Sequence, residues 1–414
     1  MKTKDYQLRR VAITGVGTLC SMGIGIKEFW KNLIQGKSGI RQIQSFGTNT
    51  FKTKIGGEID QSRIKAFLKR EKRDFDRVIG YALFATEAAL IDADLKLKRI
   101  NLNRFGVILG SSKGPFATIC EVNKKLFKKE KIDSYHLFDC SHGSISTTIA
   151  IRYDLKGLNY LISSTSASAS HAIGLAYQKI KWGKADIILT GGAETTLLPE
   201  IFALYEATGL LSTNNNPKEA CRPFDRLRDG VVLADGSGIL ILEELEHALK
   251  RGAKIYAEVA GYGASEDAYH PASMPENGEG VARAIKLGLE DARVNIDEVD
   301  YINPHGASTK IGDASETNAI KSVFGKTAYK IPISGTKSIT GHLAGAAGAL
   351  EAVICTLVID KGIIPPTINY ENPDPVCDLD YVPNKARRRK VKVAISNSMG
   401  FGGTNACLIF RKMT

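Results

Sequence analysis

The sequence lacks a run of apolar residues long enough to cross a membrane. Its longest apolar stretch, Ala344 to Ile359, is shorter than a membrane span and contains Glu351. The basic N-terminal segment MKTKDYQLRR continues directly into VAITGVG without an apolar region of leader length, so we expect no signal peptide. A cytoplasmic protein without a membrane span is therefore expected.

Paired cysteines are also missing. The seven cysteines are scattered along the 414 residues, odd in number and without a Cys-x-x-Cys pair. This pattern argues against a disulfide framework and against a zinc site. We expect no bound metal.

Acidic residues are fewer than basic ones. The chain has 56 Lys and Arg against 44 Asp and Glu, for a net charge of +12, which indicates an acidic partner. The basic residues are spread out and form no nucleic-acid motif, so nucleic acid is not the expected partner. They are densest at Lys65 to Arg77, Lys124 to Lys131 and Lys385 to Lys392. Each of these runs is either a docking patch or a solvated surface.

One stretch, Asn159 to Glu194, organises the chain. It is typical of a strand, a tight turn of small residues (163–170), a helix, and a second strand that ends at Gly191-Gly192. A hydroxyl group at such a strand-to-helix turn lies at the positive end of the helix dipole, close to backbone N–H groups. Ser166 is therefore the candidate nucleophile.

Strands and helices alternate along the rest of the chain, and the second half repeats the first in outline. The pattern predicts strands at Val11–Gly17, Phe105–Gly110, Gly236–Glu243, Ile255–Gly263, Val299–Asn303, Val391–Ser396 and Ala406–Phe410. It predicts helices at Ile26–Ile34, Phe75–Asp94, Glu244–Arg251, Val281–Ala292 and Leu343–Asp360. The polar segment Ser45 to Asp60 is expected on the surface. Alternating strands and helices favour mainly parallel strand pairing.

Three further motifs belong with the Ser166 turn. They are Asn303-Pro-His-Gly-Ala-Ser-Thr309, Gly335-Thr-Lys-Ser-Ile-Thr-Gly-His342 and Asn397-Ser-Met-Gly-Phe-Gly-Gly-Thr-Asn405. Each is a transition from regular structure to a loop, where the chain can approach a substrate closely.

In this order, the four motifs resemble those of the β-ketoacyl-acyl carrier protein synthases of the KAS II type, condensing enzymes of fatty acid and polyketide synthesis. In that family a Thr-Ala-Cys-like turn carries the nucleophilic cysteine, and a histidine follows five residues later. Counting back from His171 places the nucleophile at position 166, where this chain has serine. The resemblance implies the α/β thiolase fold, with two pseudo-repeated halves in five α-β-α-β-α layers. Residues 1–251 would carry the nucleophile turn and residues 252–414 the two catalytic histidines.

The resemblance also implies roles for the other motif residues. His305 and His342 would hydrogen-bond the malonyl thioester oxygen as it becomes an enolate. Lys337 would orient the second histidine and add positive charge. Glu351 would pair with Lys337; the alternative is an unpaired surface carboxylate.

The glycine-rich motif near the C-terminus would shape the acyl pocket. Phe401 resembles the gate of that pocket, and its N–H with that of residue 166 would form the oxyanion hole. Gly400, Gly402 and Gly403 would permit the sharp turn that this requires.

The serine is the main departure from the family, and Pro304, Ala307 and Lys113 are lesser ones. A serine hydroxyl stays protonated near neutral pH and needs an adjacent base to attack, unlike a cysteine thiol. We therefore predict a β-ketoacyl-acyl carrier protein synthase whose condensation is impaired or modified. Both a natural serine and an engineered replacement of cysteine fit the sequence.

Other functions stay open. The chain could be a non-condensing homologue, either a malonyl decarboxylase or acyltransferase, or a chain-length-factor-like partner of an active ketosynthase. A thiolase that uses coenzyme A fits less well, because Asn397-Ser-Met-Gly-Phe stands where a thiolase has a second cysteine.

The expected partners follow from the resemblance. Acyl groups would arrive on the phosphopantetheine arm of an acidic acyl carrier protein, with no other cofactor. The strand at Gly157 to Ile162 would pair across a two-fold axis in a homodimer, and a heterodimer with an active ketosynthase is the alternative.

Overall fold

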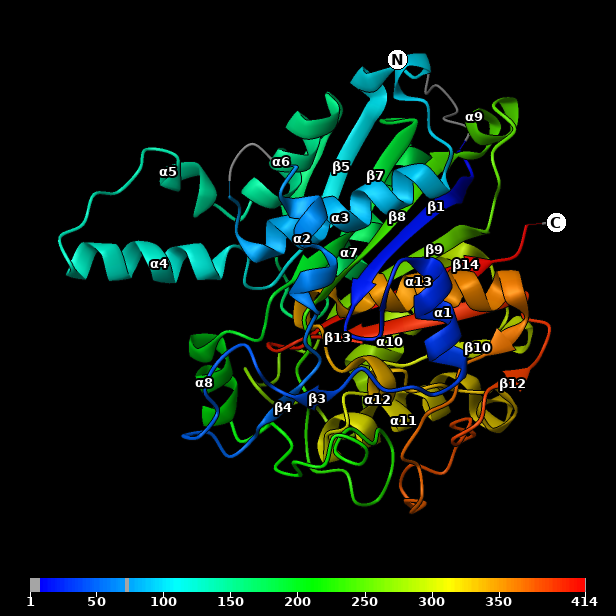
Figure 1. The fold of residues 1–414 in the computed structure, drawn as a ribbon. Helices are drawn as coiled ribbons and strands as arrows, with labels where there is room; N and C mark the ends of the chain where they lie inside the picture. The colour runs from blue at the N-terminus through cyan, green and yellow to red at the C-terminus, as the bar shows by residue number, and fades with distance from the viewer. Residues whose placement is uncertain (1–7, 71–73, 414) are drawn as a thin grey trace.

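The computed structural model describes residues 8–70 and 74–413. Its strands are β1 (Val11–Cys20), β2 (Gly23–Ile24), β3 (Arg41–Gln42), β4 (Ile55–Gly56), β5 (Phe105–Gly110), β6 (Asn159–Ile162), β7 (Ile187–Glu194), β8 (Gly236–Glu244), β9 (Ala257–Glu266), β10 (Tyr301–Asn303), β11 (Ile363–Ile364), β12 (Arg387–Arg388), β13 (Val393–Met399) and β14 (Thr404–Arg411). Figure 1 shows the two groups of long strands with helices between them and on both outer sides.

Thirteen α-helices lie within the described residues. They are α1 (Ile26–Ile34), α2 (Lys65–Leu68), α3 (Arg77–Asp92), α4 (Phe116–Phe127), α5 (His136–Asp139), α6 (Ser144–Tyr153), α7 (Ser168–Lys181), α8 (Pro199–Ala207), α9 (Leu245–Lys250), α10 (Glu279–Ala292), α11 (Lys310–Phe324), α12 (Lys337–Thr340) and α13 (Ala347–Lys361). The helices expected at Ile26–Ile34 and Val281–Ala292 are present with the same or nearly the same bounds as α1 and α10.

The internal repeat is visible in the order of the strands. The main sheet runs β10-β13-β14-β9-β1-β8-β7-β5-β6, with β2 beside β1. In the first half β5 and β7 are parallel, and β7, β8 and β1 follow as antiparallel neighbours. In the second half β10 and β13 are parallel, and β13, β14 and β9 are antiparallel. The two halves therefore repeat the same pairing, and they join through the short antiparallel contact of β1 with β9.

The hydrophobic clusters show five layers. Helices α3 and α6 pack on one side of β5, β7 and β8, while α10 and α11 cover β10, β13 and β14 on the opposite outer side. Helices α7 and α13 lie in the middle, where one cluster joins both groups of strands. α13 is buried along almost its whole length because it touches a sheet on each side, so its sequence is apolar all round.

The expectation of mainly parallel pairing was wrong. Parallel pairs are limited to β10 with β13 and to β5 with β6 and β7, and the other pairs of the main sheet are antiparallel. The chain enters β8 after a long loop-rich segment and enters β14 by a tight turn from β13, so neither strand follows a crossover helix.

Two local expectations also need correction. The strand expected to end at Gly191-Gly192 continues to Glu194, because pairing with β8 extends to Gly236. Gly191 is required within the strand, since its φ is 126° and a Cβ there would come within 2.1 Å of the Gly238 carbonyl oxygen. The segment Ser45 to Asp60 is partly interior: β4 and the side chain of Thr53 are buried, and the Glu58 carboxylate binds backbone N–H groups of 44 and 45.

One arm extends from the body. Helices α4 and α5 project beyond the sheet layers in Figure 1, and none of the α4 residues is buried. Across residues 8–70 and 74–413, none of the helices has the length and apolar character needed to span a membrane.

Candidate active site

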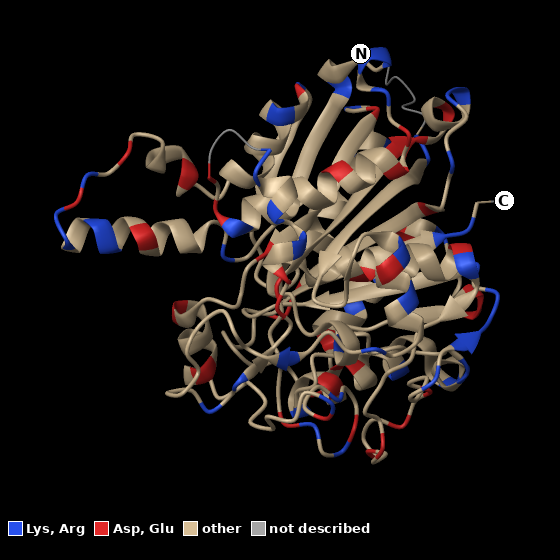
Figure 2. Ribbon diagram, viewed as in Figure 1, with Lys and Arg blue, Asp and Glu red and all other residues tan. Residues whose placement is uncertain are grey.

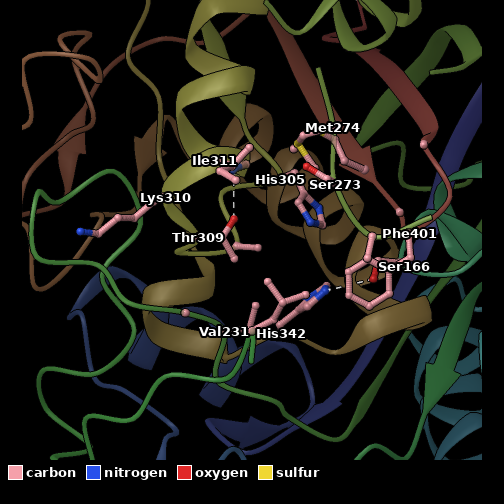
Figure 3. Close-up of a pocket in the computed structure, with 18 of the residues that line it drawn as sticks. Ser166, Val231, Ser273, Met274, His305, Thr309, Lys310, Ile311, His342 and Phe401 are labelled. Atoms are coloured by element: carbon pink, nitrogen blue, oxygen red, sulfur yellow. Dashed lines mark hydrogen bonds between the residues drawn. The ribbon is translucent and has the colours of Figure 1, made fainter. Parts of the chain in front are cut away.

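The four motifs meet at one pocket. A cavity of about 270 Å³ is lined by residues of all the motif loops, among them Ser166, His305, His342 and Phe401. Figure 3 shows these four side chains gathered at one end of the pocket, with Lys310 extending away from them. Each comes from a loop that follows a strand or a short helix, so the fold brings together segments that lie up to 235 positions apart in the sequence.

The turn that carries Ser166 is tight. β6 ends at Ile162 and α7 begins at Ser168, so Ser166 lies two residues before the helix rather than at its first position. The Ser168 hydroxyl accepts a hydrogen bond from the Ser164 N–H and donates one to the Thr165 carbonyl, which closes the turn. Ser166 is 8% exposed. The hydroxyl therefore faces the pocket close to the positive end of α7.

Ser166 has a base within reach. Its Oγ lies 3.1 Å from Nε2 of His342, and the ring of His305 stands edge-on to that of His342 at 5.3 Å between centroids. Burial, with a further contribution from the nearby Lys337 charge, holds the pKa of His342 well below its usual range. Burial, Lys337 and His342 do the same to the pKa of His305. Both imidazoles are therefore neutral near pH 7, and a neutral Nε2 can accept the serine proton.

Lys337 lies beneath the two histidines. Its Nζ forms a buried ion pair with Glu351 and donates a hydrogen bond to the backbone carbonyl of His305. The expected pairing of Glu351 with Lys337 is thus present. The expected orientation of His342 by Lys337 is corrected: in the described structure the lysine bonds the backbone of His305 and acts on His342 through its charge.

The Phe401 loop closes the pocket beside Ser166. The amides of Ser166 and Phe401 donate to no acceptor within the part of the chain that the structure describes, so both are available to an oxyanion. Gly400 is required at its position because a Cβ there would lie 2.1 Å from Oγ1 of Thr165. Gly402 and Gly403 have φ values of 88° and 95°, which side chains disfavour.

Comparisons with known proteins agree with this geometry. The family model for the N-terminal domain of β-ketoacyl synthases matches residues 8–248, and the model for the C-terminal domain matches residues 256–371. The chain belongs to the β-ketoacyl synthase family. Its architecture is the thiolase fold that the resemblance implied, whereas the division at residues 251 and 252 stays a prediction.

Members of this family from several bacteria are similar over almost their full length. The 3-oxoacyl-[acyl-carrier-protein] synthase 2 of Staphylococcus aureus (strain COL) is 39% identical over 409 residues, which cover 98% of this chain and 99% of the relative. The synthase 2 of Synechocystis sp. is 40% identical over 412 residues and 99% of each chain.

Solved structures show the same fold. One, described as a type II PKS acyl-carrier protein in complex with its ketosynthase bound to the hexaketide (AntDE:AntF), is similar with a TM-score of 0.92 and 39% identity over 99% of this chain and 100% of that chain. A β-ketoacyl synthase from Burkholderia phymatum has a TM-score of 0.90 and 34% identity over 98% of this chain and 100% of that chain.

Two buried carboxylates shape this synthase-family site and were missed from the sequence. Glu316 accepts hydrogen bonds from the N–H groups of His305 and Gly306 and from the Asn397 side chain, so it fixes the histidine loop. Glu194 accepts bonds from the loop after β5 and from the Gly345 N–H beside the His342 turn. Desolvation raises the pKa of both carboxyls. The acidic residue at the end of the apolar strand β7 was the available signal for Glu194, whereas Glu316 lies among other polar residues of α11 and has no such signal.

The departures from the family pattern occupy different places. Ala307 lines the pocket and is 8% exposed, whereas Pro304 precedes His305 outside the set of lining residues. Lys113 lies outside the cavity, with its Nζ 5.7 Å from the ring of Tyr205, which in turn neighbours Phe401. The described residues contain no group of three or more His, Cys, Asp or Glu that could hold a metal ion.

Proposed function

We propose that this chain is a β-ketoacyl-[acyl carrier protein] synthase of fatty acid or polyketide synthesis in which Ser166 receives the acyl group. The observation that carries the proposal is the 3.1 Å contact between Ser166 Oγ and His342 Nε2. It supplies the base that a serine nucleophile needs and a cysteine can do without.

Acyl transfer would involve two proton transfers, both through His342. His342 Nε2 takes the proton of Ser166 as Oγ attacks the thioester carbonyl of the acyl carrier. The negative oxygen of the tetrahedral intermediate accepts hydrogen bonds from the amides of Ser166 and Phe401. The C–S bond then breaks, the carrier thiolate takes the proton back from His342, and the acyl group remains as an ester on Ser166.

Condensation would use the two neutral histidines. After acylation the proton of neutral His342 moves from Nδ1 to Nε2, and His305 and His342 then donate hydrogen bonds to the thioester oxygen of a malonyl carrier, which stabilises the enolate formed as carbon dioxide leaves. The enolate carbon attacks the ester carbonyl, the C–Oγ bond breaks, and the Ser166 oxygen takes a proton from solvent through His342. An ester is a weaker acyl donor than a thioester, so condensation is slower than in a cysteine enzyme.

The remaining residues of the site would support these steps. The Lys337–Glu351 pair holds positive charge below the histidines, which favours their neutral form. Phe401 covers the acyl position and Gly400, Gly402 and Gly403 give its loop the required shape. The reaction would need no cofactor beyond the phosphopantetheine arm of the carrier. We propose that it takes place in the cytosol, where enzymes of fatty acid synthesis typically work.

The partner would be an acidic acyl carrier protein. A similar solved ketosynthase is described in complex with its acyl-carrier protein. In this chain Lys65, Lys69, Lys128 and Lys129 are exposed, and Lys124 is engaged with Glu200. Figure 2 shows basic residues on the α4 arm and beside β12 as well as elsewhere. Residues 71–73 of the first basic run lie outside the described residues.

Incubation with acyl-carrier and malonyl-carrier proteins, followed by mass spectrometry, tests the proposal. We expect an acyl ester on Ser166 and a lengthened β-ketoacyl product. Carbon dioxide release without an acyl ester would identify a malonyl decarboxylase, and an ester without elongation would identify an acyltransferase. Absence of all three from folded protein would contradict a catalytic function.

A catalytically silent partner is the second candidate. A solved ishigamide ketosynthase/chain length factor is similar, with a TM-score of 0.91 and 35% identity, so the fold also serves in heterodimers. The complete set of His305, His342 and Lys337 favours catalysis instead. Co-purification with a cysteine-bearing ketosynthase in a heterodimer, together with no acylation of Ser166, would support the silent role.

A further inference from the structure

The residue before Ser166 has an unusual backbone. Thr165 stands where the family's Thr-Ala-Cys-like turn has alanine, and its φ is 49°. Positive φ is strained for a β-branched residue. A threonine at such a position therefore needs contacts that hold it there.

The Thr165 hydroxyl makes such a contact with the loop that covers Ser166, residues 400–403, called here the cover loop. Oγ1 of Thr165 donates a hydrogen bond of 3.0 Å to the carbonyl oxygen of Phe401. In return, Oγ1 of Thr404, directly after the cover loop, donates a bond of 3.2 Å to the carbonyl of Ser164. Two hydroxyls thus cross-link the nucleophile turn and the cover loop in opposite directions.

The peptide group between Phe401 and Gly402 forms a second hydrogen bond, through its N–H. The N–H of Gly402, which belongs to the peptide whose carbonyl Thr165 binds, donates a bond of 2.8 Å to the carbonyl of Pro271. Both polar groups of this peptide are therefore bound to different parts of the chain. The Phe401 N–H belongs to the preceding peptide, whose Gly400 carbonyl accepts a hydrogen bond of 3.1 Å from the Gly403 N–H. The two peptides share the Cα of Phe401, so a bond lost on one frees the φ and ψ rotation that aims the other.

We propose that Thr165 is a positioning residue whose hydroxyl holds the cover loop closed over Ser166 and aims the Phe401 amide at the oxyanion. This role rests on the proposed acyl transfer to Ser166. Thr165 does not touch the reacting atoms; it acts through the Phe401–Gly402 peptide. Removing the hydroxyl leaves that peptide with its single bond to Pro271, so the loop opens more often.

Hydrogen exchange followed by mass spectrometry measures this opening without any substrate. The variant T165V keeps the shape of the side chain and loses the hydroxyl, whereas T165S keeps the hydroxyl. We expect amides of residues 399–405 to exchange about five-fold faster in T165V, equivalent to ~1 kcal/mol for one neutral hydrogen bond. T165S should match the parent, and exchange in α10 should be the same in all proteins. T165A gives the same comparison if T165V does not fold.

Acylation of Ser166 by an acyl-pantetheine thioester is the second readout. We expect T165V to acylate more slowly than the parent by about two-fold or more, because the Phe401 amide is less well aimed at the oxyanion even in the closed loop, and T165S to acylate at the parental rate. Unchanged exchange in T165V, equal exchange in T165V and T165S, or faster exchange without slower acylation would each overturn the role of Thr165. A parent that is never acylated would instead refute the proposed function, while the exchange data would still show whether the hydroxyl holds the loop.

Discussion

The oxygen nucleophile at position 166 needs a neighbouring base to remove its proton. A thiol near a helix N-terminus can ionise by itself, whereas the Ser166 hydroxyl depends on the His342 Nε2 that lies 3.1 Å away. Nδ1 of His342 has no hydrogen-bond partner among the described residues, so no carboxylate strengthens this base as in a Ser-His-Asp triad. We therefore expect this pair to catalyse acyl transfer more slowly than a full triad.

The variant Ser166→Cys should restore the family's nucleophile. Sulfur for oxygen changes only bond length and radius, and both histidines and the Phe401 amide are already in place. We expect β-ketoacyl product formation to rise by at least ~10-fold, because the thiolate needs no proton acceptor and the thioester is a better acyl donor. Product analysis beside the parent checks this, and Ser166→Ala is the control without a nucleophile. A cysteine variant that is alkylated at 166 and still makes no product would show that the site serves another task.

The pH dependence of acylation should reflect the lowered pKa of His342. The histidine must be neutral to accept the serine proton, and its pKa lies well below the ordinary 6.5 because of burial and Lys337. As pH falls, protonation begins only when this lowered pKa is approached. We therefore expect the acylation rate of Ser166 to stay level from pH 8 to 6.5 and to fall only at lower pH.

A paired variant isolates the contribution of Lys337 to that profile. The double variant Lys337→Met/Glu351→Gln removes the charge near His342 without leaving an unpaired carboxylate. Its acid limb should move to higher pH than that of the parent, while burial keeps it below 6.5. An acid limb above pH 6.5 in the parent would contradict the neutral base.

At the scale of elements, the ion pair between α12 and α13 is the main electrostatic contact beneath the site. Lys337 and Glu351 are both almost fully buried, and Oε2 of Glu351 has no further partner among the described residues. Removing one member of a buried pair leaves an uncompensated charge. We expect Lys337→Met and Glu351→Gln each to lower the free energy of unfolding by ~3–5 kcal/mol, and the double variant to lose less than the sum.

The exposed pair Lys125–Glu121 on α4 offers a matched control. Its removal should cost only ~0.3–0.5 kcal/mol, as for other i,i+4 pairs on helix surfaces. Urea denaturation of both sets of variants gives the comparison. Equal, small effects in the two sets would mean that the buried pair does not organise the region below the histidines.

Element positions could be predicted from periodicity, but their pairing could not. The bounds of α1 and β5 agree with the sequence pattern, because apolar spacing reports burial directly. Strand direction in β8 depends on how the long segment after β7 returns to the sheet, and in β14 on the short turn after Met399; the alternation of strands and helices records neither. The interior position of Thr53 likewise depends on a distant partner, the carbonyl of Ser212.

In the site too, local sequence patterns identified the residues but not the contacts between them. The motifs identified Ser166, His305, His342 and Phe401, and the fold brings all four to one cavity. Their contacts depend on segments outside each motif: His342 contacts Ser166 across 176 positions, and Glu316 on the next helix, α11, binds the His305 backbone. The catalytic roles follow from the family resemblance and from these contacts together, and they stay proposals until Ser166 is shown to be acylated.

At the scale of the whole molecule, one edge of the main sheet is left open. β6 is the last strand in the sheet order and pairs only with β5 within the described chain. The β6 edge and the projecting arm expose large apolar side chains: Tyr160 of β6 is 42% exposed, Phe127 of α4 90% and Leu137 of α5 89%. An unpaired strand edge with exposed apolar side chains favours association with another chain, which buries both.

We therefore predict a homodimer in which β6 of two copies lie side by side across a two-fold axis. Sedimentation at micromolar concentration should give a mass twice the 44.9 kDa of the chain. The variant Tyr160→Asp places one carboxylate of each copy close to its symmetry mate on this edge, and like charges in a paired edge oppose association, so the dimer should dissociate more readily. Tyr269→Asp introduces the same charge at a tyrosine that is 63% exposed elsewhere, and it should leave the mass unchanged. A monomeric parent would refute the homodimer, and a heterodimer with a cysteine-bearing ketosynthase through the β6 edge would then be the assembly to test. Equal dimer content of the two variants would show that β6 is not the interface.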